Sequence, residues 1–129
     1  MSGIGRNMDY STLSDFEINK RVAQYIDITP DNIFDNEEVI FKPVGNDEFE
    51  KFDPCNKPEH AMPIILENNI NLIHGENELF ELFEHYSAYT INDSGEFIAS
   101  DSLKSKKSIY RLGMEVYLRI KDNRSLTHD

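Results

Sequence analysis

The stretch Phe52–Asn68 reads FDPCNKPEHAMPIILEN and holds the only cysteine of the chain and three of its five prolines. Pro58 suits the first turn of a helix, where the backbone N–H group has no partner to lose. Pro63 does not suit a helix interior, because it removes a hydrogen bond and its ring contacts the preceding turn. We therefore predict a turn over residues 53–57, one short helical turn, and a kink or restart near Met62 before an apolar tail.

The segments on either side of this stretch carry helix signals. Ser14 followed by Glu17 forms a capping box, and apolar residues then recur at helical spacing. This first helix should end before Thr29–Pro30, because the residue before a proline avoids helical backbone angles. A last helix is predicted to begin near Ser108. One face of it carries Ile109, Leu112, Gly113, Val116, Tyr117 and Ile120.

Gly113 lies within the apolar face of this last helix. A glycine in a helix interior costs about 1 kcal/mol relative to alanine. We expect close packing of the helix on a sheet to offset this cost.

Short β-prone runs lie between the helices. Residues 39–44 are predicted to form an edge strand at best, because Pro43 cannot donate to a sheet ladder. Residues 45–51 are predicted to be a charged loop, and residues 70–74 a strand that Gly75 ends.

The turn sequence Asn92–Gly95 predicts a β-hairpin that joins residues 86–91 to residues 96–99. Residues 76–84 fit either a short amphipathic helix or a strand. Together these elements predict an α+β fold, in which a small, mostly antiparallel sheet is covered by N-terminal, central and C-terminal helices.

A length of 129 residues fits one domain. We expect a flexible leader over residues 1–12, a single domain over residues 13–122 and a flexible tail over residues 123–129. No apolar run approaches the ~20 residues of a membrane span, and the first residues lack the apolar core of a signal peptide. An intracellular protein without a membrane contact is therefore expected.

The charge of the chain is strongly negative and unevenly spread. Twenty-four acidic residues against thirteen basic ones give a net charge of −11. Residues 27–53 hold nine acids and two lysines, whereas residues 104–124 hold seven bases and two acids. An acidic field repels nucleic-acid phosphates and anionic membranes, and it favours a partner with a basic surface.

Cys55 and His60 are the candidate catalytic pair, since a nearby imidazole can lower the pKa of a thiol and accept its proton. The alternative is that Cys55 is a small buried residue. Asp53, Cys55 and His60 are too few ligands for a zinc site, so no metal or cofactor is predicted. Asp53 and Asn56 are expected to be turn and helix-capping residues. The predicted ligand-binding or partner-binding residues are Asp53, Cys55, Asn56, His60, Glu48 and Glu50.

Other catalytic motifs are not found in the sequence. It contains no glycine-rich phosphate loop, no His-Glu-x-x-His helix and no serine-centred nucleophile elbow. Basic residues near the last helix could contact a phosphate backbone, but bases that flank a helix are usually its solvated face. These bases are Lys104, Lys106, Lys107, Arg111, Arg119 and Lys121.

Three parts of the sequence carry a family resemblance: Leu13–Lys20, the stretch Phe52–Asn68, and Arg111–Met114 with Val116–Leu118. They resemble the NinX-like proteins of tailed bacteriophages, which are small accessory proteins with no established activity. The order of the elements is also similar to that of the phage ABA-sandwich domains, which implies a sheet between helical layers. The resemblance implies a phage or prophage gene product that acts in the bacterial host cytoplasm.

These features predict a small acidic accessory protein that binds a host macromolecule. The leading hypothesis is an inhibitor of antiviral defence, of the anti-CRISPR or anti-restriction type, whose partner is a host protein with a basic, nucleic-acid-binding surface. One alternative is a small-ligand or nucleotide-binding sponge with residues 53–60 as a pocket wall, and another is a small cysteine-dependent enzyme. A monomer and a homodimer paired through an exposed strand edge are both compatible with the sequence.

Overall fold

The computed structural model describes residues 9–75, 85–102 and 106–127 of the chain. Within these residues it contains three α-helices and six β-strands, which confirms the predicted α+β class. Short 3-10 turns precede the first helix and the first strand. The helices are α1 (Asp15–Tyr25), α2 (Pro58–Glu67) and α3 (Ile109–Thr127). The strands are β1 (Ile33–Phe34), β2 (Val39–Pro43), β3 (Phe49–Lys51), β4 (Asn71–Gly75), β5 (His85–Ile91) and β6 (Phe97–Asp101).

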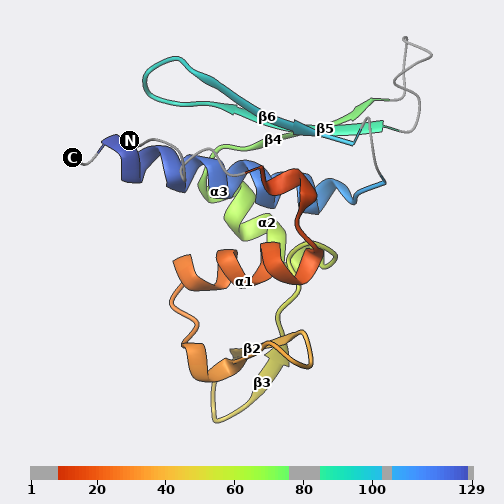
Figure 1. The fold of residues 1–129 in the computed structure, drawn as a ribbon, viewed down its shortest axis with the longest axis vertical. Coiled ribbons are helices and arrows are strands. Elements are labelled where there is room, and N and C mark those ends of the chain that lie inside the picture. The colour runs from red at the N-terminus through yellow and green to blue at the C-terminus, as the bar shows by residue number, and fades with distance from the viewer. Residues whose placement is uncertain (1–8, 76–84, 103–105, 128–129) are drawn as a thin grey trace.

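The strands form two separate three-stranded antiparallel sheets, where a single sheet was expected. The small sheet has the strand order β1-β2-β3, and the large sheet has the order β4-β5-β6. Figure 1 shows the helices stacked between them, with α3 next to the large sheet and α1 next to the small one. The helices thus separate strands that the local pattern assigned to one layer.

Helix α3 lies at the centre of the core. The run of residues from Arg111 to Leu118 is buried without interruption, although the sequence pattern predicted only one apolar face. The large sheet covers one side of the helix, and α1 and α2 cover the other side (Figure 1). Because both sides are covered, the polar Arg111 and Glu115 are as inaccessible as Leu112 and Val116.

The outer face of the large sheet carries exposed apolar side chains. Ile73, Ile91 and Phe97 are 43%, 61% and 65% exposed. The Tyr89 ring stacks on Phe97 with 5.3 Å between the ring centroids. Within the residues that the structure describes, no helix packs on this face (Figure 1). Among the described residues, the large sheet therefore has helices on one face only, whereas the ABA-sandwich resemblance implies a sheet between helical layers.

Helix α1 begins where the capping box predicted. The Ser14 hydroxyl accepts a hydrogen bond from the Glu17 N–H group at 3.1 Å. The helix ends at Tyr25, and Asp27 then adopts a left-handed φ of 67°. The predicted end before Thr29–Pro30 is confirmed.

Helix α2 runs without a break from Pro58 to Glu67, so the predicted restart near Met62 is wrong. Pro63 lies inside the helix, where it removes one backbone hydrogen bond. Ala61, Ile64 and Ile65 of the same helix are buried in the core. This tertiary packing keeps the helix continuous across Pro63, because burial of an apolar face contributes more to helix stability than local propensity does.

Strand β2 is the middle strand of the small sheet, and not the edge strand that Pro43 predicted. The Val44 N–H group donates to the Glu48 carbonyl at 2.9 Å. Because hydrogen-bonded and non-bonded pairs alternate in an antiparallel ladder, the nitrogen of Pro43 points away from β3. On its other side, β1 pairs only with Val39 and Ile40. The proline therefore costs the sheet no ladder hydrogen bond.

The other predicted strands and loops have mixed outcomes. Residues 49–51 form β3, so the charged loop predicted over residues 45–51 is wrong in its second half. The strand predicted over residues 70–74 is confirmed as β4, and the predicted hairpin is confirmed as β5 and β6. Residues 76–84 lie outside the described residues.

Gly113 packs mainly against a helix, where packing on a sheet was expected. A Cβ atom at this position would lie 2.8 Å from Ile65 Cδ1 in α2 and 3.6 Å from Leu72 Cδ2 in β4. A side chain at this position would therefore require Ile65 to shift.

The folded part of the chain extends beyond the predicted domain limits. Tyr10, which was assigned to the leader of residues 1–12, is only 6% exposed, and its hydroxyl donates to the Asp122 carboxylate. Helix α3 continues to Thr127, into the tail predicted over residues 123–129. The contact between Tyr10 and Asp122 joins residues 112 positions apart, so the local pattern does not reveal it.

Candidate functional site

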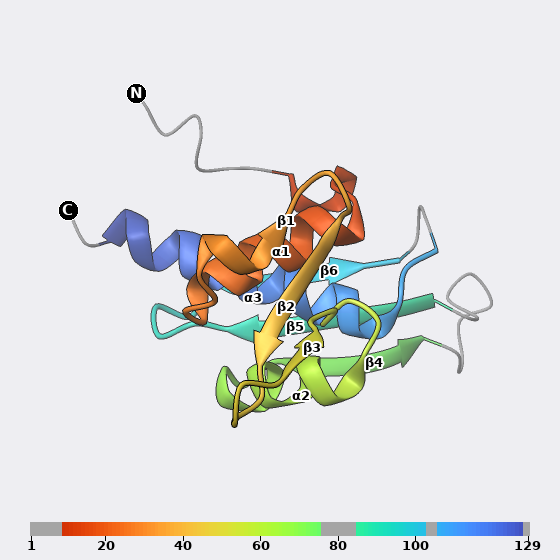
Figure 2. The ribbon, with the colours of Figure 1, turned by 90° about the horizontal axis from the view of Figure 1, so that it is seen from below.

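A groove of about 320 Å³ lies between α1, the small sheet and the turn before α2. Figure 2 looks onto the small sheet, which crosses over α1 in this view. The apolar wall of the groove consists of Phe16, Val39, Ile40 and Phe52. Four carboxylates and two lysines also line it. These charged residues are Asp15, Glu37, Glu38, Asp53, Lys51 and Lys57.

Asp53, one of the predicted binding residues, is held in the groove by amide side chains. Its carboxylate accepts hydrogen bonds from Asn19 Nδ2 at 2.8 Å and from Asn56 Nδ2 at 3.1 Å. Asn19 in turn accepts a hydrogen bond from the backbone N–H group of Cys55 at 3.1 Å. The expected capping role of Asp53 and Asn56 is wrong, because Lys57 is the N-cap residue of α2 and no side chain caps it. Their bonds instead fix the turn against α1.

A buried ion cluster lies next to the groove and joins α1 to α3. Arg111 donates to Glu115 and to Asp15 at 2.8 Å each, and to the Tyr10 carbonyl at 3.0 Å. Lys107 donates to the same Glu115 carboxylate at 2.8 Å. Burial by itself lowers the pKa of Arg111, but the hydrogen bonds to Asp15 and Glu115 raise it overall. The guanidinium group is therefore a permanent positive charge between two elements of the core.

Cys55 is buried in this arrangement. Its exposed fraction is 0%, and its Sγ atom lies 3.7 Å from the Asp15 carbonyl oxygen. Burial raises the pKa of the thiol, so the thiol stays protonated at neutral pH. Among the described residues, no hydrogen bond joins Cys55 to His60. This geometry fits the structural alternative for Cys55 and does not supply a thiolate nucleophile.

His60 is occupied by other partners. Its Nδ1 atom accepts a hydrogen bond from the Asp53 N–H group at 3.0 Å, and its Nε2 atom lies 2.7 Å from a Glu50 carboxylate oxygen. The hydrogen bond with His60 holds the pKa of Glu50 below its usual value. The Phe52 ring lies beside the imidazole, with 5.3 Å between the centroids. His60 therefore ties α2 to β3.

Two carboxylates of the groove have no side-chain partner in the part of the chain that the structure describes. The side chains of Glu37 and Glu38, between β1 and β2, are exposed and take part in no hydrogen bond or ion pair within the described residues. The sequence indicated them only as members of an acidic run and assigned them no binding role. Glu48 and Glu50, which were assigned to binding, lie in the same acidic segment but do not line the groove.

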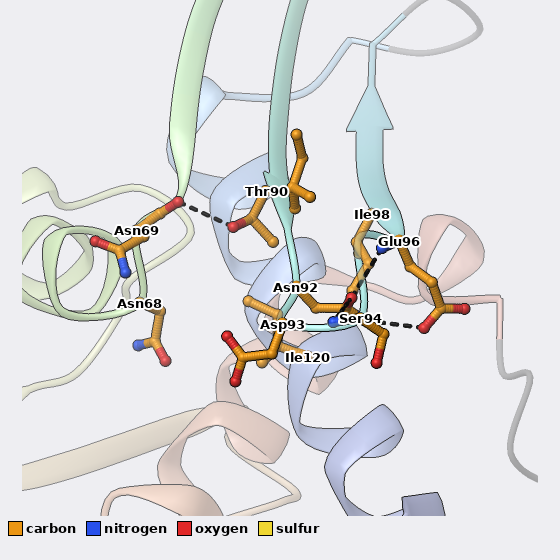
Figure 3. A pocket seen from close by; sticks show the side chains of 10 residues that line it. Asn68, Asn69, Thr90, Asn92, Asp93, Ser94, Glu96, Ile98 and Ile120 are labelled. Atoms are coloured by element: carbon orange, nitrogen blue, oxygen red, sulfur yellow. Dashed lines mark hydrogen bonds between the residues drawn. The ribbon is translucent and has the colours of Figure 1, made fainter.

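A second hollow of about 210 Å³ lies at the turn of the β5–β6 hairpin (Figure 3). Its apolar lining residues are Ile91, Ile98 and Ile120. Several of its polar groups already bond within the protein: Thr90 Oγ1 donates to the Asn69 carbonyl at 3.0 Å. None of the site residues predicted from the sequence lines this hollow.

The bases near α3 are largely engaged inside the molecule. Lys107 and Arg111 are both held by Glu115. The ammonium group of Lys121 lies over two tyrosine rings, 6.0 and 5.4 Å from their centroids. Lys104 lies outside the described residues. The structure therefore gives no support to a phosphate-binding patch at Lys107 and Arg111.

The described residues offer neither a metal site nor a membrane-spanning helix, and the chain has no match among known proteins. In residues 9–75, 85–102 and 106–127, no three His, Cys, Asp or Glu side chains are placed to hold a metal ion, and no helix has the length and apolarity needed to cross a membrane. Comparisons with protein-family models, curated proteins and solved structures give no match. The NinX-like resemblance stays a prediction from the sequence segments that carry it.

The burial of Cys55 leads to a direct prediction. We expect the thiol of the folded protein to react with 5,5′-dithiobis(2-nitrobenzoate) far more slowly than the thiol of the urea-unfolded chain. A local opening free energy of about 3 kcal/mol slows the reaction by a factor of about 100. The measurement is the absorbance of the released thiolate at neutral pH, and equal rates for both states would contradict the buried position.

Proposed function

We propose that this chain is a small acidic accessory protein of phage or prophage origin that acts by binding a host protein with a basic surface. In this proposal it inhibits an antiviral defence, of the CRISPR or restriction type, in the bacterial cytoplasm. The supporting observation is the charge of the small-sheet lobe, defined as residues 27–53.

The small-sheet lobe concentrates uncompensated negative charge. Its nine acidic residues and two lysines give it a formal charge of −7, and eight of the nine acids are exposed. Within the described residues, only Asp35 and Glu50 of these acids take part in an ion pair. In Figure 1 the lobe lies at the opposite end of the molecule from the large sheet. Such a surface accelerates association with a basic partner and selects against acidic ones.

The proposal is tested by charge reversal on the lobe outside the groove. Asp31→Lys combined with Glu48→Lys changes two exposed side chains that have no partner in the described residues. We expect the variant to bind the protein captured from host cells about tenfold more weakly at low salt, or about 1.4 kcal/mol. In about 1 M salt, where the Debye length is about 3 Å, the difference should nearly vanish.

The matched control makes the same charge change elsewhere. Glu67→Lys combined with Asp93→Lys alters exposed carboxylates on α2 and on the hairpin, and it should leave capture close to that of the wild type. An equal loss of binding affinity in both variants would show that binding depends on net charge alone, and it would overturn the role of the lobe. If the wild-type protein retains no host protein at low salt, the proposed function itself is wrong.

The size of the groove favours a second candidate function, a small-ligand or nucleotide sponge. A volume of about 320 Å³ lies at the lower end of the range for small-molecule sites. The excess of carboxylates over lysines works against a phosphate group, however. A thermal-shift screen with nucleotides separates the two functions, because a ligand at 100 times its Kd stabilises the protein by ~2.7 kcal/mol. No shift with any nucleotide would remove this candidate.

A further inference from the structure

We infer that the groove between α1 and the small sheet binds one arginine side chain of the basic partner. The inference rests on the proposed function, since it requires a partner that presents basic residues. It goes beyond that function by naming the chemical group that the groove receives and the side chains that hold it.

The apolar wall of the groove fits the stem and the flat head of an arginine. Phe16 and Val39 are half-buried, so each presents part of its surface to the groove, while Ile40 and Phe52 are buried behind them. The methylene stem of an arginine can lie along such a wall while its charged head stays hydrated. A guanidinium also stacks on aromatic faces, whereas the ammonium of lysine is compact and strongly hydrated.

Glu37 and Glu38 supply the acceptors for the guanidinium. The other two groove carboxylates are already engaged, because Asp15 accepts from Arg111 and Asp53 accepts from amide side chains. The carboxylates of Glu37 and Glu38 have no partner within the described residues. Charge-assisted bonds from arginine to carboxylate are about twice as strong as neutral hydrogen bonds. The guanidinium group is therefore held at the Glu37–Glu38 turn.

The charge balance of the groove selects a cation. Arg111 neutralises Asp15, and the three other carboxylates outnumber the ammonium groups of Lys51 and Lys57, so a phosphate or carboxylate ligand meets net repulsion. The turn before α2, which forms part of the groove wall, is also preformed. Asn19 and His60 both bond Asp53 and hold this turn in place. A preformed site loses less conformational entropy when the ligand binds.

The test is an NMR titration of the ¹⁵N-labelled full chain with the capped peptide acetyl-Gly-Arg-Gly-amide. We expect the amide signals of Phe16, Val39 and Ile40 to shift. Glu37→Gln combined with Glu38→Gln keeps the size of both side chains and removes their charge, so it should weaken binding about tenfold or more. The same peptide with citrulline in place of arginine keeps the shape without the charge and should not bind.

Glu59→Gln combined with Glu67→Gln is the control, because it removes two exposed charges from α2 and should leave the titration unchanged. Equal shifts with the citrulline peptide, or an unchanged affinity after the Glu37 and Glu38 substitutions, overturn the inference. If the inference fails in this way while Asp31→Lys with Glu48→Lys still weakens host-protein capture, the partner binds the lobe outside the groove. If the arginine peptide binds but no host protein is captured, the groove chemistry stands and the proposed function is wrong.

Discussion

Replacement of Arg111 by methionine should destabilise the protein by about 3–5 kcal/mol at neutral pH. Glu115 is only 2% exposed, and the substitution leaves Lys107 as its remaining cationic partner. Asp15 and the Tyr10 carbonyl lose a hydrogen bond at the same time. A buried carboxylate that loses one of two hydrogen-bonded cations is strongly destabilised, because Lys107 alone then compensates its desolvation. Urea unfolding followed by far-UV circular dichroism measures the loss.

A second variant separates this charge effect from lost packing. Arg111→Met combined with Glu115→Leu removes the carboxylate that has lost Arg111 and keeps apolar volume in the core. The double variant should be more stable than Arg111→Met alone by about 2 kcal/mol, even though Lys107 then loses its partner. A loss below about 1 kcal/mol in the single variant would show that Glu115 is not held mainly by Arg111.

The exchange Asn19→Asp should destabilise the protein by about 2–3 kcal/mol at pH 7. A carboxylate oxygen would replace the amide group that now donates to Asp53 at 2.8 Å, so a hydrogen bond becomes a repulsion. The bond from the Cys55 N–H group can persist, because an oxygen acceptor remains in place. Urea unfolding of the variant and the wild type at pH 7 gives the difference.

The pH dependence and a compensating exchange test the cause of this loss. Like charges raise the pKa of a carboxyl in the folded variant, so the lost stability should return as the pH falls through that raised pKa. A protonated carboxyl can then donate as the amide did. At pH 7 the added exchange Asp53→Asn should restore a donor and recover at least half of the loss. If Asn19→Asp has the same free energy of unfolding as the wild type at pH 7, Asn19 is not the link between α1 and the turn.

Part of the fold could be predicted because its signals are local. The capping box sets the start of α1 through one bond between Ser14 and Glu17. The hairpin turn is held by Asn92 Oδ1, which accepts hydrogen bonds from the N–H groups of Ser94 and Glu96 at 3.0 and 2.9 Å. Such bonds join residues a few positions apart, so residue type and spacing reveal them.

The candidate site could be predicted only in part. Asp53 and Asn56 do line the groove, but their bonding partners Asn19 and Asp15 lie in α1, far away in the sequence. The choice between a reactive and a buried Cys55 also depended on what α1 places around the turn. Residue spacing within the turn cannot supply that information, because the contact from Asn19 to Cys55 spans 36 positions.

The acidic charge of the small-sheet lobe, the α+β class and the start of α1 follow from the sequence alone, since composition, periodicity and capping act locally. The burial of Arg111 and Glu115, the middle position of β2 and the intact helix at Pro63 follow only from the packed structure. In each of these cases, contacts with elements distant in the chain outweigh or remove a local cost of about 1–3 kcal/mol. The groove has the same origin, because its walls come from three segments that meet only in the folded protein.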